Sequence, residues 1–236
     1  MKILYIYPHP DDESFGPAHV MHKQRRQGHQ VYLLTLTKGG ATKQRLKFGY
    51  SVEEMGEVRY QEMQEVAKVL DLTGMTVWDL PDSGLKDVDP RDIENVVKDE
   101  IERVQPQVVV TYAVHGISGF HDHLVTHAAV KRVYVELKEE VSYLQRLAFV
   151  TITEEEAKKG ELFHLSGSRP EDIDCVMEVE AVDIDKCHQA LDCYVTFQET
   201  IEQTRIKDFI QHKAVFEIFQ EDFDPPLEDL FEKLKS

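Results

Sequence analysis

The sequence is poor in cysteine and has no long apolar run. Its three cysteines, Cys175, Cys187 and Cys193, form no CxxC pair and cannot all pair with one another, which indicates reduced thiols in a reducing compartment. No apolar run approaches the roughly 20 residues that a membrane span requires. The apolar N-terminal run ends at Pro-His-Pro without a small-residue cleavage site, so it predicts a strand rather than a signal peptide. We predict a cytoplasmic protein without a membrane span.

Positive charge is also scarce. Lys and Arg number 27 against 44 Asp and Glu, which gives a formal net charge of −17 at pH 7. Nucleic acid and anionic membranes are therefore disfavoured as main partners, because no basic surplus exists to replace phosphate counterions. No internal repeat and no linker rich in Pro, Gly or Ser marks a boundary. We expect residues 1–236 to form one domain.

Apolar β-rich runs alternate with helical patterns along the chain. This alternation predicts an α/β fold with a mostly parallel sheet covered by helices on both faces. Strands are expected at residues 2–7, 29–37, 76–80, 107–112, 147–153 and 175–179. Helices are expected at residues 14–27, 51–70, 89–104, 123–137 and 184–202, with a polar loop at 38–50 and a peripheral helix with an acidic tail over about the last 30 residues.

Two segments concentrate metal-ligand side chains, and each follows an expected strand. Residues 8–13 read Pro-His-Pro-Asp-Asp-Glu, and residues 118–123 read Ser-Gly-Phe-His-Asp-His. Ligands of open α/β sheets bind beyond the carboxyl ends of strands, so the two loops are expected to meet at one rim. His9 and Asp12 are three residues apart, and a histidine of the second segment would complete a His/Asp/His set. Three such ligands with one open position are typical of catalytic zinc.

Asp11 lies between these ligands in sequence and could take a proton from water on the metal. A simpler interpretation stays open for each residue alone. Asp11 and Asp12 could cap a helix, and His9 could be a packed histidine.

The two segments together resemble a known family. Pro-His-Pro-Asp-Asp-Glu, followed about 110 residues on by Gly-x-x-Asp-His, is similar to the zinc-dependent deacetylases called LmbE-like or PIG-L. The resemblance extends from Met1 to about Thr200 and implies a Rossmann-like three-layer fold. It also implies removal of acetyl groups from N-acetylglucosaminyl lipids, thiol precursors and related sugars. Within the family, residues 116–123 most resemble the bacillithiol-pathway enzymes, which act on N-acetylglucosaminyl malate.

The resemblance assigns roles residue by residue. It implies that His9, Asp12 and His123 are zinc ligands and that Asp11 is the general base. Asp122 would orient a metal-bound histidine. Iron(II) or cobalt could occupy the same ligands, and the family makes a homotrimer or homohexamer plausible.

Other matches to the family are weaker. Arg59 and Glu62 match an Arg-x-x-Glu on the family's second helix, either as site residues or as an exposed helix pair. Lys38 belongs to a Thr-Lys-Gly-Gly loop that departs from the family's Thr-x-Gly-Glu, so its expected substrate contacts are less secure.

One departure affects catalysis. Relatives carry His-Pro-Asp-His in the second motif, and its first histidine is thought to assist at the oxyanion. Phe120 stands at that position here. Either His121 takes over the role, which we favour, or the zinc and a backbone donor hold the oxyanion without it.

Three alternative functions stay open at this stage. A zinc hydrolase could act on another N-acyl sugar, or a non-catalytic Rossmann-like module could keep the motif as a relic. A nucleotide-binding enzyme is disfavoured, because no GxGxxG or P-loop follows the first strand.

Overall fold

The computed structural model describes residues 1–160 and 164–235 as a three-layer α/β protein built around a seven-stranded sheet. The sheet order is β3-β2-β1-β4-β5-β7-β6. Strands β1 to β5 are parallel to one another, and β7 runs antiparallel to β5 and β6. The strands are β1 Lys2–Tyr7, β2 Gln30–Thr37, β3 Gly74–Leu80, β4 Val108–Tyr112, β5 Arg146–Thr151, β6 Cys175–Glu178 and β7 Lys213–Ile218.

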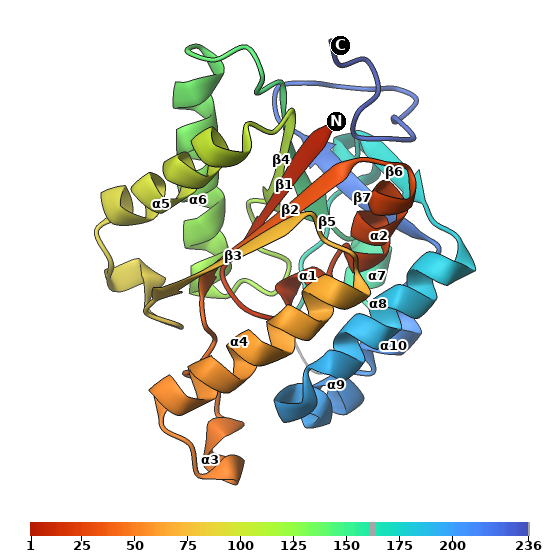
Figure 1. Cartoon of the computed structure of the whole chain (residues 1–236). Coiled ribbons are helices and arrows are strands. Elements are labelled where there is room, and N and C mark those ends of the chain that lie inside the picture. Colours follow the sequence, from red (N-terminus) through yellow and green to blue (C-terminus); the bar gives the residue numbers. More distant parts are fainter. Residues whose placement is uncertain (161–163, 236) are drawn as a thin grey trace.

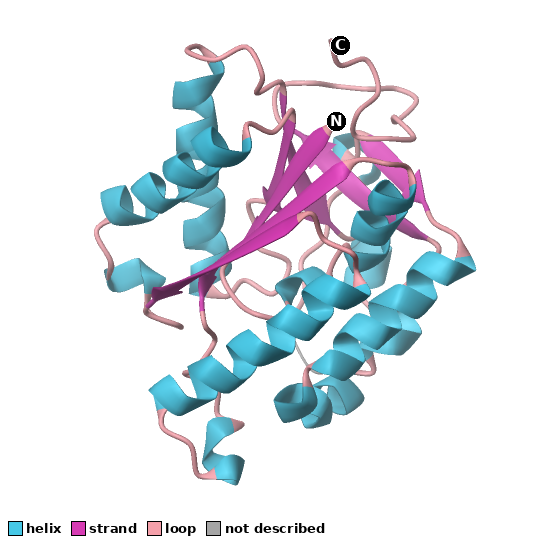
Figure 2. Cartoon of the chain, viewed as in Figure 1, coloured by secondary structure: helices cyan, strands magenta, loops and turns pink. Residues whose placement is uncertain are grey.

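Helices cover both faces of this sheet, as the sequence predicts. Figure 1 shows α5 and α6 on one side of the strands and α2, α4 and α8 on the other, and Figure 2 shows the same layers by type of element. The described helices are α1 Asp12–Phe15, α2 Ala18–Arg26, α3 Arg45–Phe48, α4 Val52–Val69, α5 Pro90–Val104, α6 His121–Lys138, α7 Glu154–Ala157, α8 Ala181–Cys193, α9 Gln198–Thr204 and α10 Ile206–Phe209.

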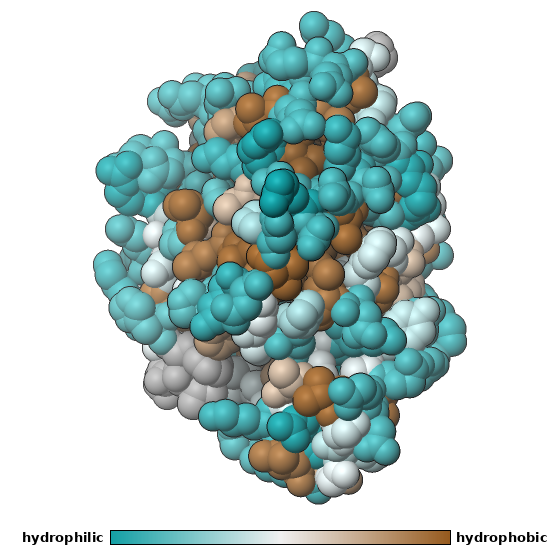
Figure 3. Space-filling model, turned by 90° about the vertical axis from the view of Figure 1, so that its left-hand side faces the viewer, coloured by the Kyte–Doolittle hydropathy of each residue, from teal (hydrophilic) through white to brown (hydrophobic). Residues whose placement is uncertain are grey.

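The central strand β1 shows why both layers form. Ile3 and Tyr5 pack into the core cluster on one face, whereas Leu4 and Ile6 pack into the cluster on the other. Successive side chains of a strand point to opposite faces, so a continuously apolar strand must be covered twice. On the α5–α6 side, polar side chains make up most of the surface and apolar ones show between them near its centre (Figure 3). Exposed apolar residues of this kind are normal for a folded domain.

Three predicted elements differ from the structure. The helix expected at 14–27 is divided into α1 and α2 at Gly16-Pro17, because proline supplies no amide donor for a continuous helix. The helix expected at 184–202 is α8 followed by the 3₁₀ helix η3 Val195–Phe197 and by α9. The polar loop at 38–50 contains the short helix α3.

The prediction for the C-terminal residues is wrong. Instead of a peripheral helix and an acidic tail, β7 enters the sheet between β5 and β6. The residues beyond it are tied to β5 by Arg146, whose side chain is 1% exposed and forms an ion pair with Glu221. Arg146 also donates to the carbonyl oxygens of Leu230 and Glu232. The buried side chain of Arg146 therefore anchors the residues that follow β7, although their composition alone predicts a solvated tail.

No helix within residues 1–160 and 164–235 combines the length and the apolarity that crossing a membrane would require.

Candidate active site

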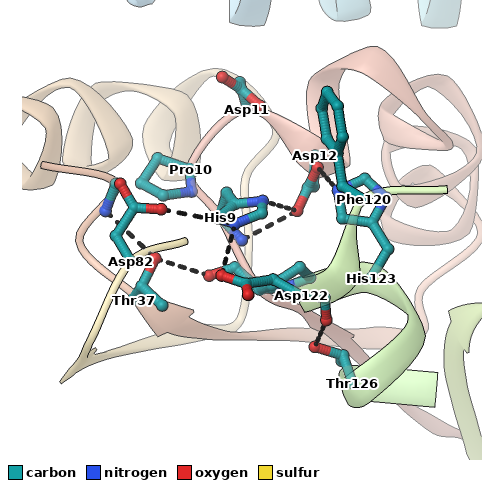
Figure 4. A network of polar contacts seen from close by, with 12 residues as sticks. His9, Pro10, Asp11, Asp12, Thr37, Asp82, Phe120, Asp122, His123 and Thr126 are labelled. Carbon is teal, nitrogen blue, oxygen red and sulfur yellow. Dashed lines mark hydrogen bonds and ion pairs between the residues drawn. The ribbon is translucent and has the colours of Figure 1, made fainter. Parts of the chain in front are cut away.

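The two ligand-rich segments meet because they follow neighbouring parallel strands. Strand β1 runs into residues 8–13, and β4 runs into the loop that precedes α6. The two strands pair in register from Ile3 with Val108 to Tyr5 with Val110. Their carboxyl ends therefore lie at the same rim, and residues about 110 positions apart in sequence become neighbours there (Figure 4).

His9, Asp12 and His123 come together at this rim. His9 Nδ1 is 3.4 Å from Asp12 Oδ2, and His123 Nε2 is 3.3 Å from Asp12 Oδ1. Each residue offers a ligand atom, and these atoms lie within 4.8 Å of one another. The predicted convergence of two imidazoles and one carboxylate is therefore present in the structure.

Hydrogen bonds fix the orientation of these three side chains. Asp12 accepts from the His9 amide and from the Tyr112 hydroxyl, both at 2.8 Å. His123 Nδ1 donates to the carbonyl oxygen of Gly116 at 2.9 Å, which turns Nε2 toward Asp12. The Tyr112 ring stacks on His123 with centroids 4.1 Å apart. A glycine is needed at position 116, because its φ is 64° and an added Cβ would lie 2.9 Å from the His123 Cβ.

Two further carboxylates lie next to the other ring nitrogen of His9, Nε2. Asp122 Oδ2 lies 3.2 Å and Asp82 Oδ1 3.5 Å from His9 Nε2. Asp122 also accepts from the Leu85 amide, and Asp82 accepts from the Ala41 amide at 2.7 Å. The contact expected between Asp122 and a site histidine is thus present. Asp82, His9 and Asp122 form a second group of three that could hold a metal ion.

Asp82 was missed by the sequence analysis. It follows Pro81 directly after β3, so it stands at the same carboxyl rim as the other acids. Its position just after an expected strand could have indicated a site residue. Pro-Asp is also a common turn dipeptide, however, so the pattern is not specific.

The charges at this rim favour a bound cation. Burial lowers the pKa of His9, but hydrogen bonding to Asp12 and the neighbouring Asp122 and Asp82 outweigh it and raise this pKa to about 10. Burial raises the pKa of Asp12, but His123 and His9 outweigh it and hold this pKa well below its usual range. The cluster thus stabilises positive charge, and its nitrogen and oxygen donors are those that zinc takes at sites with an open position. These residues fit a divalent metal ion.

Asp11 lines the same cavity as His9, Asp12 and His123. Its carboxylate points away from these three side chains (Figure 4). Its φ of 86° is unusual for a residue other than glycine and turns the side chain from the direction that Asp12 takes. Arg59 donates to Asp11 Oδ2 at 2.6 Å and to the carbonyl oxygen of Pro10 at 2.9 Å. Burial raises the pKa of Asp11 to about 6, against the lowering effect of Arg59. Asp11 is therefore a mostly buried carboxylate, with 13% of its side chain exposed, held by one cation.

Arg59 is the buried cation on which this arrangement depends. It is 3% exposed, and its guanidinium lies over the Phe197 ring at 4.6 Å. Arg59→Leu is expected to lower the free energy of unfolding by about 3–5 kcal/mol, because the Asp11 carboxylate would stay buried without its partner. Urea denaturation measures the change. The matched control is Arg132→Leu, whose pair with Glu136 is solvent-exposed and is worth at most about 1 kcal/mol. Equal losses in the two variants would contradict the assignment.

Three other predicted residues lie away from the cavity. Glu62 is buried and accepts from the Thr196 amide and hydroxyl, so it joins α4 to η3. Lys38 lies 3.6 Å from both Glu57 and Asp79. His121 is exposed at the first position of α6. None of the three lines the cavity formed by the described residues, whereas Phe120 does.

The cavity has a volume of about 420 Å³. This is the size of a site for a small ligand. Its lining includes His9, Asp11, Asp12 and His123 together with residues of α1, α10, β5 and β7. Asp11 and the three metal-ligand residues therefore line one and the same cavity.

Fold and site together define a Rossmann-like α/β protein with a candidate two-histidine, one-aspartate metal centre at the carboxyl rim of its sheet. Residues 4–134 match the family model described as PIG-L, GlcNAc-PI de-N-acetylase. The chain belongs to this family, as the two motifs predicted.

Several curated relatives of this chain are named as deacetylases of N-acetylglucosamine conjugates. The 1D-myo-inositol 2-acetamido-2-deoxy-alpha-D-glucopyranoside deacetylase of Thermomonospora curvata is 32% identical over 154 residues, which cover 56% of this chain and 51% of the relative. The probable N-acetyl-alpha-D-glucosaminyl L-malate deacetylase 2 of Bacillus subtilis is 29% identical over 140 residues, or 58% of this chain and 63% of the relative. The chain spans about half the length of the curated relatives it matches first.

Solved structures confirm the fold. A deacetylase of the teicoplanin biosynthesis pathway superposes with a TM-score of 0.73 at 14% identity, covering 92% of this chain and 97% of that one. GalB of Pseudomonas putida, a 4-carboxy-2-hydroxymuconate hydratase, superposes with a TM-score of 0.65 at 13% identity, covering 94% and 97%. The same fold thus supports more than one reaction, and the reaction must be argued from the residues of the site.

Proposed function

We propose that this protein is a metal-dependent N-deacetylase that hydrolyses the acetamide of an N-acetylglucosaminyl conjugate. The observation that carries the proposal is the group of His9, Asp12 and His123 ligand atoms within 4.8 Å of one another, with Asp11 lining the same cavity. Membership of a family whose curated relatives are deacetylases supports the reaction type. Zinc is the first metal to test, and iron(II) and cobalt suit the same donors.

The chain's own residues then have distinct tasks. A zinc ion held by His9, Asp12 and His123 would acidify a water and polarise the acetamide carbonyl. Asp122 and Asp82 orient His9 by contacting its outer nitrogen. Asp11 accepts the proton of the attacking water, and once protonated it can deliver that proton to the departing amine. Arg59 keeps Asp11 in place for both transfers.

The sugar conjugate is a finer part of this proposal. Resemblance at residues 116–123 and the Bacillus subtilis relative favour N-acetylglucosaminyl malate, while the Thermomonospora curvata relative favours an inositol conjugate. A non-catalytic module would bind such sugars without turnover.

Metal analysis of the purified chain together with acetate release tests the proposal. The panel consists of N-acetylglucosaminyl malate, N-acetylglucosaminyl inositol, N-acetylglucosamine and diacetylchitobiose. We expect a bound divalent metal and acetate release from at least one glycoside. A fully metal-loaded protein that releases no acetate from any of the four would overturn the proposal.

The oxyanion role of His121 stays a prediction. Its side chain is exposed and would have to turn into the cavity when substrate binds. If it does, His121→Ala is expected to slow acetate release by about 10²–10³-fold, the usual cost of one lost oxyanion donor. His212→Ala, another exposed histidine, is the control. An unchanged rate in His121→Ala would instead leave the oxyanion to the metal and the backbone.

A further inference from the structure

The loop between β4 and α6 contains a sharp turn at Ile117. Gly116 and Ile117 both have positive φ values, 64° and 58°, and the Ser118 amide donates to the Gly116 carbonyl oxygen at 2.6 Å. This hydrogen bond, with a positive φ at the residue between its partners, is typical of a γ-turn of the rare and strained form. Positive φ is unusual for a β-branched residue such as isoleucine, so surrounding contacts must hold the turn in this conformation.

This turn sets the orientation of a candidate metal ligand. The Gly116 carbonyl oxygen also accepts from Nδ1 of His123 at 2.9 Å. That hydrogen bond uses Nδ1 and directs the other ring nitrogen, Nε2, toward Asp12 at 3.3 Å. A turn that opened at Ile117 would rotate the Gly116 carbonyl group away from the His123 ring. The backbone conformation of Ile117 and the orientation of His123 are therefore linked.

The side chain of His115 contacts the turn directly. Its Nδ1 accepts from the Ile117 amide at 3.0 Å, so the neutral His115 ring carries its proton on Nε2. That nitrogen lies 3.3 Å from the hydroxyl oxygen of Thr151 and 3.4 Å from that of Ser168. His115 thus joins the turn to β5 and to the segment that follows it.

A chain of hydroxyl groups fixes the tautomer of His115. The hydroxyls of Thr151 and Ser168 are 2.6 Å apart, and Ser168 donates to the Glu217 carboxylate at 2.5 Å. Since the Ser168 proton is directed at the carboxylate, the two hydroxyl oxygens can accept from each other's side and from Nε2 of His115. Burial and the neighbouring His127 lower the pKa of His115, so its ring is neutral at pH 7 and Nδ1 remains an acceptor.

We propose that His115 is a positioning residue that orients the metal ligand His123 through the turn between them. By holding Ile117 in its strained conformation, His115 keeps the Gly116 carbonyl group directed at the His123 ring. This inference rests on the proposed deacetylase function, which gives His123 its task as a metal ligand. His115 is not a ligand itself and does not line the cavity formed by the described residues.

The zinc affinities of two variants of similar shape test the contact at Nδ1. In His115→Asn the side-chain oxygen can still accept from the amide two residues on, as asparagine does in turns, so near-wild-type affinity is expected. His115→Leu offers no acceptor, and its Kd for zinc is expected to rise by about 10–100-fold, the usual cost of disturbing a partner of a metal ligand. Val114→Ala is the control, because Val114 lies in the same loop and is 65% exposed.

Two outcomes of the zinc titration would overturn the inference. One is a His115→Leu protein that binds zinc as tightly as the Val114→Ala control. The other is an equal loss of affinity in His115→Asn and His115→Leu, which would show that the acceptor for the Ile117 amide is not what matters. Circular dichroism establishes that each full-length variant is folded.

A second substitution tests the strain in the turn. Glycine adopts positive φ without a steric penalty, so Ile117→Gly in the His115→Leu background is expected to restore most of the lost zinc affinity. A folded double variant whose Kd stays as high as that of His115→Leu would contradict a role through the turn.

A measurement without metal separates this inference from the proposed function. Imidazole ¹⁵N NMR of the metal-free chain is expected to show a slowly exchanging Nδ1 proton on His123, and to show loss of this protection in His115→Leu. If the wild-type chain binds no zinc or releases no acetate, the deacetylase function fails, and the exchange of this proton still decides whether His115 positions His123. Equal protection in the two proteins would exclude that role.

Discussion

Asp11→Asn is expected to lower kcat by about 10²–10⁴-fold while the protein keeps its metal. Loss of a positioned general base has an effect of this size. The amide oxygen of asparagine can still accept from Arg59, and asparagine tolerates the left-handed backbone at position 11, where φ is 86°. Shape and the Arg59 contact are therefore preserved, and only the proton acceptor is lost.

Two measurements are needed to interpret this variant. Metal content by mass spectrometry establishes that the ligand set is intact, and acetate release from the best substrate gives kcat. Asp87→Asn serves as the control, because Asp87 is an exposed aspartate in the 3₁₀ helix η1 Leu85–Asp87. Near-normal turnover in Asp11→Asn would refute the general-base assignment. Loss of the metal would show that Asp11 is itself a ligand.

The central part of the fold could be predicted from sequence because its signals are local. Strand β4 is a buried run of three valines, a threonine and a tyrosine, and helix α4 is capped at its start by Ser51 in a capping box with Glu54. Residues 8–13 and 118–123 each follow such a strand, so their meeting required only that β1 and β4 be neighbours. The parallel alternation of strands and helices made that arrangement the expected one.

Other features depended on contacts that no local pattern carries. Strand β7 pairs with β5 and β6, and its neighbours in the sheet are more than 30 residues away in sequence. Glu62 shares a helix with Arg59 and matches a family motif, but its partner is the Thr196 amide of a later segment. The motif predicts a glutamate at position 62. It does not predict which residue the carboxylate of Glu62 contacts.

The break between α1 and α2 is a different case, because its signal was present. Pro17 cannot donate the amide that a continuous helix needs, and the structure ends α1 before it. The break has a consequence for the site: α1 is a short helix whose residues Asp12 and Phe15 both line the cavity. One turn of helix thus places a candidate metal ligand, Asp12, and an apolar side chain, Phe15, at the same cavity.

His123→Ala is expected to abolish metal binding and, with it, acetate release. His9 belongs to two groups of possible ligands, one with Asp12 and His123 and the other with Asp82 and Asp122. If the first group holds the ion, removing His123 leaves only two protein ligands. Asp82→Asn then removes only a side chain that orients His9, which typically costs about 10–100-fold in metal affinity.

The two variants thus distinguish the two groups of ligands. Titration of the metal-free proteins with zinc gives the affinities, and circular dichroism establishes that both variants are folded. A protein that keeps its metal without His123 but loses it in Asp82→Asn would place the ion among the carboxylates on the outer nitrogen of His9. That outcome would move the ion to the other nitrogen of His9, away from Asp12 and His123. We expect the first group to hold the ion, because two imidazoles and one carboxylate suit zinc better than one imidazole and two carboxylates.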